Sequence, residues 1–273
     1  MTGAALTTYL FVPATHTARI AKAFASGAHA VIADLEDAVD ASDKPAARQQ
    51  LSDYLQASPA ARELWVRINA VDTPWFADDL ALLKQHRASL AGVMLSKTQS
   101  SADLQRLDCA LPVMALIESA QGLLALADIC QHRQLVRLAF GSADLSRDLG
   151  CEDATDVLAP MRSQLVLHSA AAGLLPPVDG VTFALDDPQQ VQADAAHAAR
   201  CGFGAKLCIH PSQVQPAMRG FAPSDAQCRW AENIVLRVEC GSGAQRVGGE
   251  MVDKPVIARA RAILALRETL LFK

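Results

Sequence analysis

Two apolar runs near the middle of the sequence each end in an acidic residue. Residues 111–118 read LPVMALIE and end at Glu118, and residues 135–144 read LVRLAFGSAD and end at Asp144. Such short apolar runs are typical of strands buried on both faces, and a terminal carboxylate marks where the strand leaves the core. If the two strands are neighbours, two oxygen ligands lie side by side. That pair is the minimum that a protein contributes to a Mg²⁺ site, whose remaining ligands are usually water and substrate.

The composition limits the classes of protein to which the chain can belong. With 273 residues, of which 51% are hydrophobic and only 5% aromatic, the chain can bury a substantial aliphatic core in one large α/β domain or two smaller ones. The net charge of −4 comes without a basic block, so we expect no nucleic-acid partner. No apolar stretch approaches the roughly 20 residues of a membrane-spanning helix, so we expect no membrane partner either.

Cysteine usage and the first residues indicate the compartment. The 7 cysteines are scattered and include no C-x-x-C pair, which is typical of reduced thiols and not of a disulfide framework or a zinc site. Met1 is followed almost at once by a strand-like run, without the basic and apolar regions of an export signal. These features predict a soluble, cytoplasmic protein.

Strand-like and helix-like segments alternate along most of the chain. Short apolar runs followed by amphipathic segments predict parallel strands joined by crossover helices. Eight such runs favour a closed (β/α)8 barrel, a TIM barrel, over an open doubly wound sheet, because neither G-x-G-x-x-G nor G-x-x-x-x-G-K-[ST] occurs in the sequence. The predicted strands are residues 8–13, 30–35, 64–68, 92–95, 111–118, 135–144, 179–183 and 205–210.

The remainder of the chain is too long to be a tail. We expect the barrel to span residues 1–211 and a C-terminal helical extension to span residues 212–273, with helices over 226–239 and 256–270. Between these helices, residues 241–249 read GSGAQRVGG, which indicates a flexible linker or a lid that closes over a site. The predicted architecture is therefore a barrel followed by a helical extension.

Polar and charged residues follow the predicted strands at their carboxyl ends, where the βα loops of a barrel build the active face. They form a ring of acids with an arginine and a lysine among them, which suits an acidic small molecule held by a metal. Taken singly, each also has a structural explanation, such as an ion pair for Arg67 or a solvent-reaching side chain for Lys97. The joint placement of Arg67, Glu118 and Asp144 favours function, because structural need does not predict it. The residues are Asp34, Glu36, Asp37, Arg67, Asn69, Lys97, Glu118, Asp144 and His210.

A collinear set of short motifs runs along almost the whole chain. The motifs are YLFVP (9–13), AVIADLEDAV (30–39), VRIN (66–69), ALIE (115–118), FGSAD (140–144), RS (162–163), VDG (178–180), GAKLCIHPSQ (204–213) and MVDKP (251–255). In order and spacing, this set resembles the citrate lyase β-subunit family of the HpcH/HpaI aldolase superfamily, which includes malyl-CoA, citramalyl-CoA and citryl-CoA lyases. No single motif is diagnostic, whereas the ordered set is highly specific.

The resemblance implies an activity and a set of site residues. The implied reaction is Mg²⁺-dependent, reversible cleavage of a 3-hydroxy-3-carboxyacyl-CoA to an acyl-CoA, such as acetyl-CoA, and a 2-oxo acid, with coenzyme A as part of the substrate. By matching position, Glu118 and Asp144 are the metal ligands, and Arg67 contacts the carboxylate of the oxo acid or the developing oxyanion. We expect the other substrate contacts to come from Glu36, Asp37 and Lys97.

The resemblance also implies a catalytic residue in the C-terminal segment. In the family, an aspartate there handles the proton of the reaction, often in the site of the neighbouring subunit, and the matching residue is Asp253. Taken by itself, its position before Pro255 fits a helix N-cap better than a catalytic role. If Asp253 is catalytic, the active site forms only in a homo-oligomer, which we expect to be a trimer or a multiple of one.

One turn departs from the family pattern. After the first strand, relatives usually carry V-P-G-[DN]-[RK], whereas residues 12–16 of this chain read VPATH, with Ala14, Thr15 and His16 in the turn. The change removes a glycine and a basic residue, so the phosphates of coenzyme A need other partners. The candidate contacts are Arg19, Lys22 and Lys206.

The sequence leaves three functions open. The first is a stand-alone acyl-CoA lyase that acts on citramalyl-CoA or malyl-CoA. The second is the β subunit of a citrate lyase complex, which binds partner subunits and acts on an acyl-carrier-protein thioester. The third is a barrel that keeps the fold and the metal pair but has a binding or regulatory role. The complete set of Arg67, Glu118, Asp144 and Asp253 argues against the third.

Overall fold

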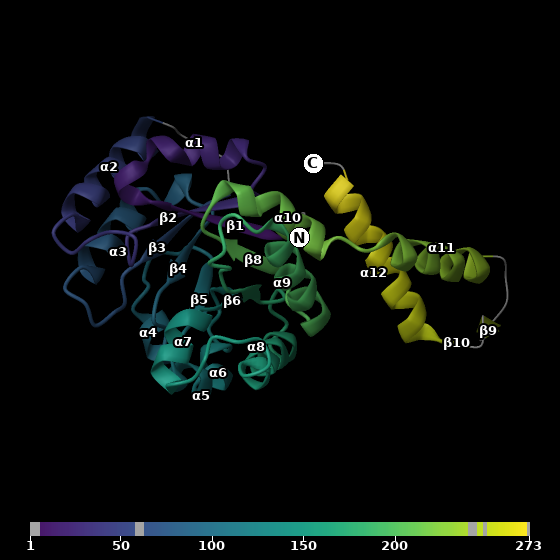
Figure 1. Ribbon diagram of the computed structural model, residues 1–273. Coiled ribbons are helices and arrows are strands. Elements are labelled where there is room, and N and C mark those ends of the chain that lie inside the picture. Colours follow the sequence, from purple (N-terminus) through teal and green to yellow (C-terminus); the bar gives the residue numbers. More distant parts are fainter. Residues whose placement is uncertain (1–5, 58–62, 240–244, 248–249, 272–273) are drawn as a thin grey trace. The chain divides into compact units, whose positions relative to one another are not determined.

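The computed structural model describes residues 6–57, 63–239, 245–247 and 250–271. Its contacts divide the chain into two units (Figure 1): a larger unit, Leu6–Gly220, and a C-terminal unit that begins at Phe221. In the described part of the chain, no helix is long and apolar enough to cross a membrane.

The larger unit is a closed barrel of eight parallel strands. Each strand pairs with the next along the chain, and β8 closes the barrel by pairing with β1, with Leu10 opposite Cys208. The predicted (β/α)8 fold is therefore confirmed, and the open sheet is excluded. The strands are β1 (Thr8–Pro13), β2 (Ala30–Asp34), β3 (Leu64–Ile68), β4 (Gly92–Leu95), β5 (Val113–Ile117), β6 (Leu135–Phe140), β7 (Val178–Asp179) and β8 (Ala205–Cys208).

Helices surround these strands (Figure 1), because each amphipathic segment buries one face against the barrel. In the helix over Ala18–Ala25, for example, Ile20 and Ala23 are buried while Lys22 is exposed. The helices are η1 (Ala14–His16), α1 (Ala18–Ala25), α2 (Lys44–Ala57), α3 (Phe76–Gln85), η2 (Arg87–Ser89), α4 (Ser101–Gln105), α5 (Ala120–Leu124), α6 (Leu126–Ile129), α7 (Ser142–Leu149), α8 (Ala159–Ala171), α9 (Pro188–Cys201), η3 (Pro211–Gln213) and α10 (Val214–Phe221).

The sixth strand is shorter than the sequence predicted. It ends at Phe140, and the polar stretch SADLSRDL forms α7, which ends where Gly150 adopts a positive φ of 68°. A strand that continued to Asp144 would have placed these polar side chains in the barrel wall, so the prediction of a strand end there is wrong. Asp144 instead lies in the first turn of a helix. The seventh strand is also shorter than predicted and comprises only Val178–Asp179.

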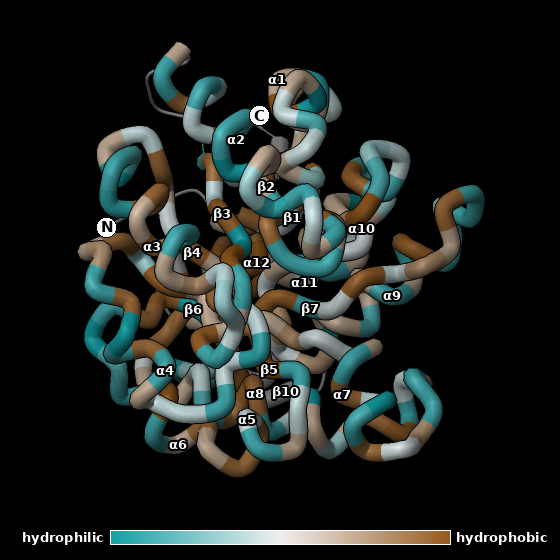
Figure 2. The backbone as a smooth tube through the Cα atoms, turned by 90° about the vertical axis from the view of Figure 1, so that its left-hand side faces the viewer, coloured by the Kyte–Doolittle hydropathy of each residue, from teal (hydrophilic) through white to brown (hydrophobic). Residues whose placement is uncertain are grey.

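Large side chains fill the barrel interior at the end from which β1 starts. Tyr9 and Trp65 meet edge to face with ring centroids 6.0 Å apart, and Met94 packs in the same cluster. Arg137 of β6 donates to the Tyr9 hydroxyl at 3.3 Å and to the Leu6 carbonyl at 3.0 Å. Figure 2 shows hydrophobic residues along the inner strands and long hydrophilic stretches on α2. This end of the barrel is closed by packing, and the opposite end is left for chemistry.

The C-terminal unit has a core of its own. It consists of α11 (Asp225–Glu239), the antiparallel strands β9 (Gln245–Val247) and β10 (Glu250–Val252), and α12 (Lys254–Leu271). The buried residues Ala231, Ile234, Val252 and Ala260 form its core. Of the segment predicted as a linker or lid, residues 241–244 and 248–249 lie outside the described part of the chain.

Helix α10 was not predicted, and it belongs to the barrel unit. It packs on α9 so closely that a Cβ atom at Gly220 would lie 2.5 Å from the Cβ of Ala195 and 2.6 Å from the carbonyl oxygen of Gln192. This contact explains why the division of the structure follows Gly220 and not residue 211, where the sequence placed it.

Replacing Gly220 by alanine tests this packing. By helix propensity alone, alanine would stabilise α10 by about 1 kcal/mol relative to glycine. Because the new methyl group meets atoms of α9 that cannot move aside, we expect instead a loss of about 1–3 kcal/mol in the free energy of unfolding, measured by urea denaturation. Gln215→Ala, at an exposed position of the same helix, is the control and should change that free energy by less than about 0.5 kcal/mol. A Gly220→Ala protein more stable than the wild type would contradict this packing.

Candidate active site

Glu118 is fixed at the end of β5 by neighbours on two sides. It is the first residue after the strand and only 4% exposed. Its Oε1 accepts the backbone N–H of Lys97 at 2.6 Å. On the other side lies Gly141, where a Cβ atom would come within 2.5 Å of the Glu118 Cβ and 2.8 Å of its Oε2. The glycine between β6 and α7 therefore leaves the space that this carboxylate occupies.

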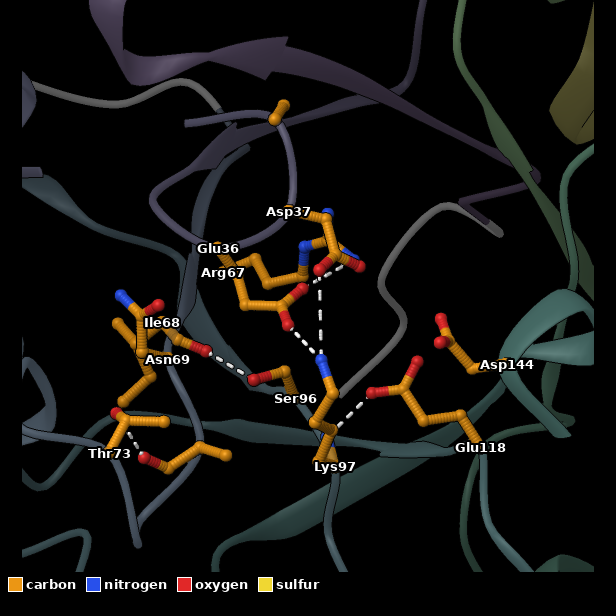
Figure 3. Close-up of polar contacts among 12 residues, drawn as sticks. Glu36, Asp37, Arg67, Ile68, Asn69, Thr73, Ser96, Lys97, Glu118 and Asp144 are labelled. Carbon is orange, nitrogen blue, oxygen red and sulfur yellow. Dashed lines mark hydrogen bonds and ion pairs between the residues drawn. The ribbon is translucent and has the colours of Figure 1, made fainter. Parts of the chain in front are cut away.

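Asp144 reaches the same place from the first turn of α7. Figure 3 shows its carboxylate beside that of Glu118, and both residues line the same two cavities. Arg147, one turn further along α7, pairs with Oδ1 of Asp144 and is largely exposed. The two predicted metal ligands thus lie together, although one comes from a strand end and the other from a helix.

Arg67 is held near the end of β3 by acids from the neighbouring strand. Its Nε and Nη2 donate to the two oxygens of Asp34 at 2.7 and 2.6 Å, and its Nη1 lies 3.2 Å from Oε2 of Glu36. The guanidinium also covers the ring of Phe11, 4.6 Å from its centroid. Burial alone would lower the pKa of Arg67, but the pairing with Asp34 outweighs it and raises the pKa. Arg67 is therefore a rigid and permanent cation.

A second cation, Lys97, extends this network. Its Nζ pairs with Oε1 of Glu36 and lies 3.7 Å from Oδ1 of Asp37. Burial raises the pKa of Glu36. For Asp37, the effect of burial is outweighed by a hydrogen bond with Glu36 and by the charges of Arg67 and Lys97, so its pKa is lowered. The three predicted substrate contacts therefore form one network with Arg67 (Figure 3), and Asp37 is its exposed member.

Two cavities meet at the pair of acids. One, of about 370 Å³, is lined by Arg67, Asp37, Glu118 and Asp144 together with a largely apolar surface. The second, also of about 370 Å³, shares Glu118 and Asp144 but is lined by polar groups. A ligand held by the two acids therefore has an apolar cavity on one side and a polar cavity on the other. The apolar residues are Phe11, Leu116, Phe140, Val181, Phe183, Leu207 and Ile209.

The chemistry of this donor set fits a divalent cation that also binds a ligand. Burial raises the pKa of Glu118 to about 8, and the nearby charge of Glu36 acts in the same direction. A cation beside such a carboxyl group favours its ionised form. Among the described residues, no group of three or more His, Cys, Asp or Glu side chains could enclose a metal ion. Two carboxylates suit Mg²⁺, which keeps water or substrate as further ligands, and do not suit a structural zinc.

The residues predicted to contact the phosphates of coenzyme A are separate from this site. Arg19 and Lys22 are exposed on α1. Lys206 is buried in β8, where its Nζ donates to Oδ2 of Asp179 at 3.0 Å and to the carbonyl of Gly180 at 2.7 Å. Its ammonium group is therefore already paired inside the barrel, and this burial contradicts the prediction that it binds a phosphate.

Asp253 begins α12 in the C-terminal unit. Its Oδ1 accepts the N–H of Val256 at 3.1 Å, and its carbonyl accepts the N–H of Ile257 at 3.1 Å, which is the geometry of a helix N-cap. The residue is exposed. The capping role, one of the two that the sequence left open, is therefore present in the structure, and the catalytic role stays a prediction.

Sequence reasoning did not single out two residues that contact the pair of acids, Gly141 and Arg147. The change from an apolar run to SADLSRDL was the signal for the helix that carries the arginine. Two further residues at strand ends have structural contacts. Among the strand-end residues, Asn69 donates to Oδ2 of Asp79 at 2.6 Å. His210 accepts the N–H of Ser212 and so caps η3.

Comparison with known proteins places the chain in a family. Residues 7–211 match the family model described as HpcH/HpaI aldolase/citrate lyase. The chain belongs to this family. The resemblance drawn from the ordered motifs is therefore confirmed.

Relatives of the chain are named for different activities, either as citrate lyase subunits or as thioesterases. The chain is 33% identical to the citrate lyase subunit beta-like protein of Deinococcus radiodurans, over 96% of this chain and 97% of that protein. It is also 33% identical to the (3S)-malyl-CoA thioesterase of Cereibacter sphaeroides, over 96% of this chain and 94% of that protein. Among solved structures, CitE of Mycobacterium tuberculosis in complex with magnesium, acetoacetate and coenzyme A is 35% identical, with a TM-score of 0.86 over 97% of this chain and 99% of that chain.

Replacing Gly141 by alanine should weaken Mg²⁺ binding and also lower the stability of the protein, because the new Cβ atom would lie 2.5 Å from the Glu118 Cβ. The φ of −92° at Gly141 accommodates alanine without strain, but the new methyl group would displace the Glu118 carboxylate. We expect the dissociation constant for Mg²⁺, measured by isothermal titration calorimetry, to rise about 10–100-fold, as is typical when the support of a metal ligand is lost.

The matched control for this substitution is Gly92→Ala. Gly92 begins β4, and a methyl group there would crowd the ring of Trp65 of β3. This variant therefore carries a comparable clash at the other end of the barrel strands and should leave the Mg²⁺ affinity unchanged. If Gly141→Ala and the wild type bind Mg²⁺ equally, the space beside Glu118 has no part in metal binding.

Proposed function

We propose that the chain is a Mg²⁺-dependent carbon–carbon lyase. Its substrate is a 3-hydroxy-3-carboxyacyl-CoA of the citramalyl-CoA or malyl-CoA type, and its products are an acyl-CoA, such as acetyl-CoA, and a 2-oxo acid. The observation that carries the proposal is the pair of Glu118 and Asp144 at a cavity that Arg67 also lines. The joint presence of magnesium, acetoacetate and coenzyme A in the CitE structure supports the same set of ligands here.

Different residues of the site would hold the metal, orient the substrate and exclude water. Glu118 and Asp144 would hold the Mg²⁺ ion, which would supply Lewis-acid polarisation of the oxygens at the hydroxy-acid end of the substrate. Arg67, held by Asp34, aims a fixed positive charge at the negative charge that develops there. The apolar lining, which includes Phe140 and Leu207, limits access of water to the reacting carbons.

Cleavage breaks the bond between the hydroxyl-bearing carbon and the carbon next to the thioester. The hydroxyl loses its proton and becomes the carbonyl of the 2-oxo acid. The electron pair of the broken bond stays with the thioester fragment, which takes up a proton to give the acyl-CoA. A group that accepts and returns a proton is therefore needed beside the site.

Asp253 is the group that we assign to this proton transfer. One oxygen of its exposed carboxylate caps α12, and a carboxylate oxygen has further lone pairs that can accept a proton. The assignment follows the family pattern, in which this aspartate often serves the neighbouring subunit. It therefore includes a homo-oligomer, a trimer or a multiple of one, in which one copy completes the site of another.

The direct test is an assay of the purified protein with Mg²⁺ and citramalyl-CoA, malyl-CoA or citryl-CoA. We expect release of a 2-oxo acid and an acyl-CoA without free thiol. Glu118→Gln and Asp144→Asn each remove a charge that holds the metal, so each should lower kcat/KM by at least about 100-fold. The oxo acid is followed as its hydrazone, and free coenzyme A is followed with a thiol reagent.

The products distinguish the alternatives. Hydrolysis of the thioester would release free thiol and leave the hydroxy acid intact, and the chain would then be a thioesterase. Cleavage of an acyl-carrier-protein thioester but not of any CoA thioester would indicate a citrate lyase β subunit. Full activity in EDTA would exclude the role given to the metal.

A separate comparison tests Asp253. Because asparagine and serine also cap helices, Asp253→Asn and Asp253→Ser keep the start of α12 but remove the carboxylate. We expect both variants to bind Mg²⁺ and the acyl-CoA normally in calorimetry and to lose turnover by about 100–10,000-fold. If capping is its sole role, both variants stay active, and only Asp253→Ala is impaired through lower stability.

A further inference from the structure

Lys97 has a backbone conformation that its residue type rarely adopts. Its φ is +48°, and in the described part of the chain Ala110 is the other residue besides glycine with a positive φ. A lysine in the left-handed region is strained, and such strain persists where the surrounding structure fixes it. Lys97 lies two residues after the end of β4 and contacts Glu118. The strained residue is therefore part of the site.

The residues on both sides of Lys97 anchor the turn. The buried hydroxyl of Ser96 donates to the carbonyl of Ile68 at 2.8 Å, and the buried hydroxyl of Thr98 donates to the carbonyl of Leu95 at 3.0 Å. Gly122 of α5 also approaches so closely that a Cβ atom there would lie 2.5 Å from the Thr98 carbonyl oxygen. The turn is therefore held from β3, from its own strand and from the helix that follows Glu118.

The left-handed turn directs two successive N–H groups toward β5. The N–H of Lys97 donates to Oε1 of Glu118 at 2.6 Å, and the N–H of Thr98 donates to the carbonyl of Leu116 at 3.2 Å. In an extended strand, successive N–H groups point to opposite sides, so β5 would receive only one of them. The two N–H groups therefore meet two different acceptors, and it is the one from Lys97 that reaches the Glu118 carboxylate.

The side chain of Lys97 serves a different part of the site. Its Nζ pairs with Oε1 of Glu36, and the other oxygen of Glu36 lies 3.2 Å from Nη1 of Arg67. The backbone of one residue thus contacts an acid of the metal pair, while its side chain acts on the arginine through Glu36. The two contacts are made by different atoms and can be separated by substitution.

We propose that Lys97 is a positioning residue whose left-handed backbone orients the Glu118 carboxylate for a divalent cation. Its side chain independently positions Arg67 through Glu36. The proposal rests on the Mg²⁺ site proposed above and assigns Lys97 a role that its backbone performs, apart from the substrate contact expected of its side chain.

The test compares substitutions that all remove the ammonium group but differ in their tolerance of a positive φ. Glycine and asparagine adopt the left-handed region readily, whereas β-branched residues do not. We expect Lys97→Gly and Lys97→Asn to keep the Mg²⁺ dissociation constant within about threefold of the wild type. Lys97→Val should raise it about 10–100-fold, the range seen when the support of a metal ligand is lost. Calorimetry with MgCl₂ alone gives these constants, and Lys97→Thr replaces valine if the valine protein does not fold.

Ala110 supplies the matched control. Ala110→Val places the same β-branched residue at a φ of +51°, in an exposed position before β5, at the opposite end of that strand from Glu118. It carries the same backbone strain and should bind Mg²⁺ like the wild type. This control separates an effect on Glu118 from a general loss of stability, which thermal unfolding of each variant measures in parallel.

The outcomes distinguish this inference from the proposed function. If the wild type binds no Mg²⁺, the proposed metal site fails, and the positioning role fails with it. If the wild type binds Mg²⁺ and the β-branched variants at residue 97 bind it as tightly as Lys97→Gly, the metal site stands and the positioning role of the Lys97 backbone is overturned. Selective weakening by valine or threonine at residue 97 supports the inference.

Discussion

The site depends on the burial of one carboxyl group at the end of a barrel strand. Burial removes water from Glu118 and raises its pKa to about 8. The N–H of Lys97 offsets this cost only in part, because a single neutral donor does not replace the hydration of a carboxylate. A cation placed beside Glu118 stabilises the ionised form that burial disfavours. The fold therefore leaves part of the desolvation cost of the Glu118 carboxylate uncompensated, and a bound cation would offset the remainder.

In contrast to Glu118, the acids at the end of β2 are paired with cationic side chains. Asp34 pairs with Arg67, and Glu36 lies between Arg67 and Lys97, so each acid in this half of the site has a cationic partner. Around Glu118 and Asp144 the compensation is weaker: Glu118 accepts a backbone N–H, and the cation beside Asp144 is the exposed Arg147. A divalent cation placed there would meet two carboxylates whose partners are a neutral donor and a solvent-exposed side chain.

Much of the barrel could be predicted from the sequence, because its strands are short, continuous apolar runs that end at polar residues. Residues 64–68 and 92–95 are strands with the predicted bounds. The error at Asp144 arose because the predicted strand was extended from the apolar run 135–140 through Gly141 into the polar stretch SADLSRDL, which forms a helix. The pairing of Arg67 with Asp34 was also beyond the sequence, since it depends on the register that sets these two residues opposite each other. Backbone conformation at Lys97 leaves no signal in residue type, because a left-handed lysine is determined by its neighbours.

The correction at Asp144 changes how the two acids work together. Glu118 is buried directly after β5, where its neighbours fix it, whereas Asp144 lies in the first turn of α7 and is more exposed. An acid in the first turn is stabilised by the helix dipole, which lessens its need for a buried partner. Arg147 also pairs with Asp144 from the solvent side, and an exposed side chain of this kind can move away at little cost. The proposed metal pair would then combine a rigid acid with an adjustable one, which suits a cation whose other ligands change during a reaction. Two acids buried equally deeply on neighbouring strands would lack that freedom.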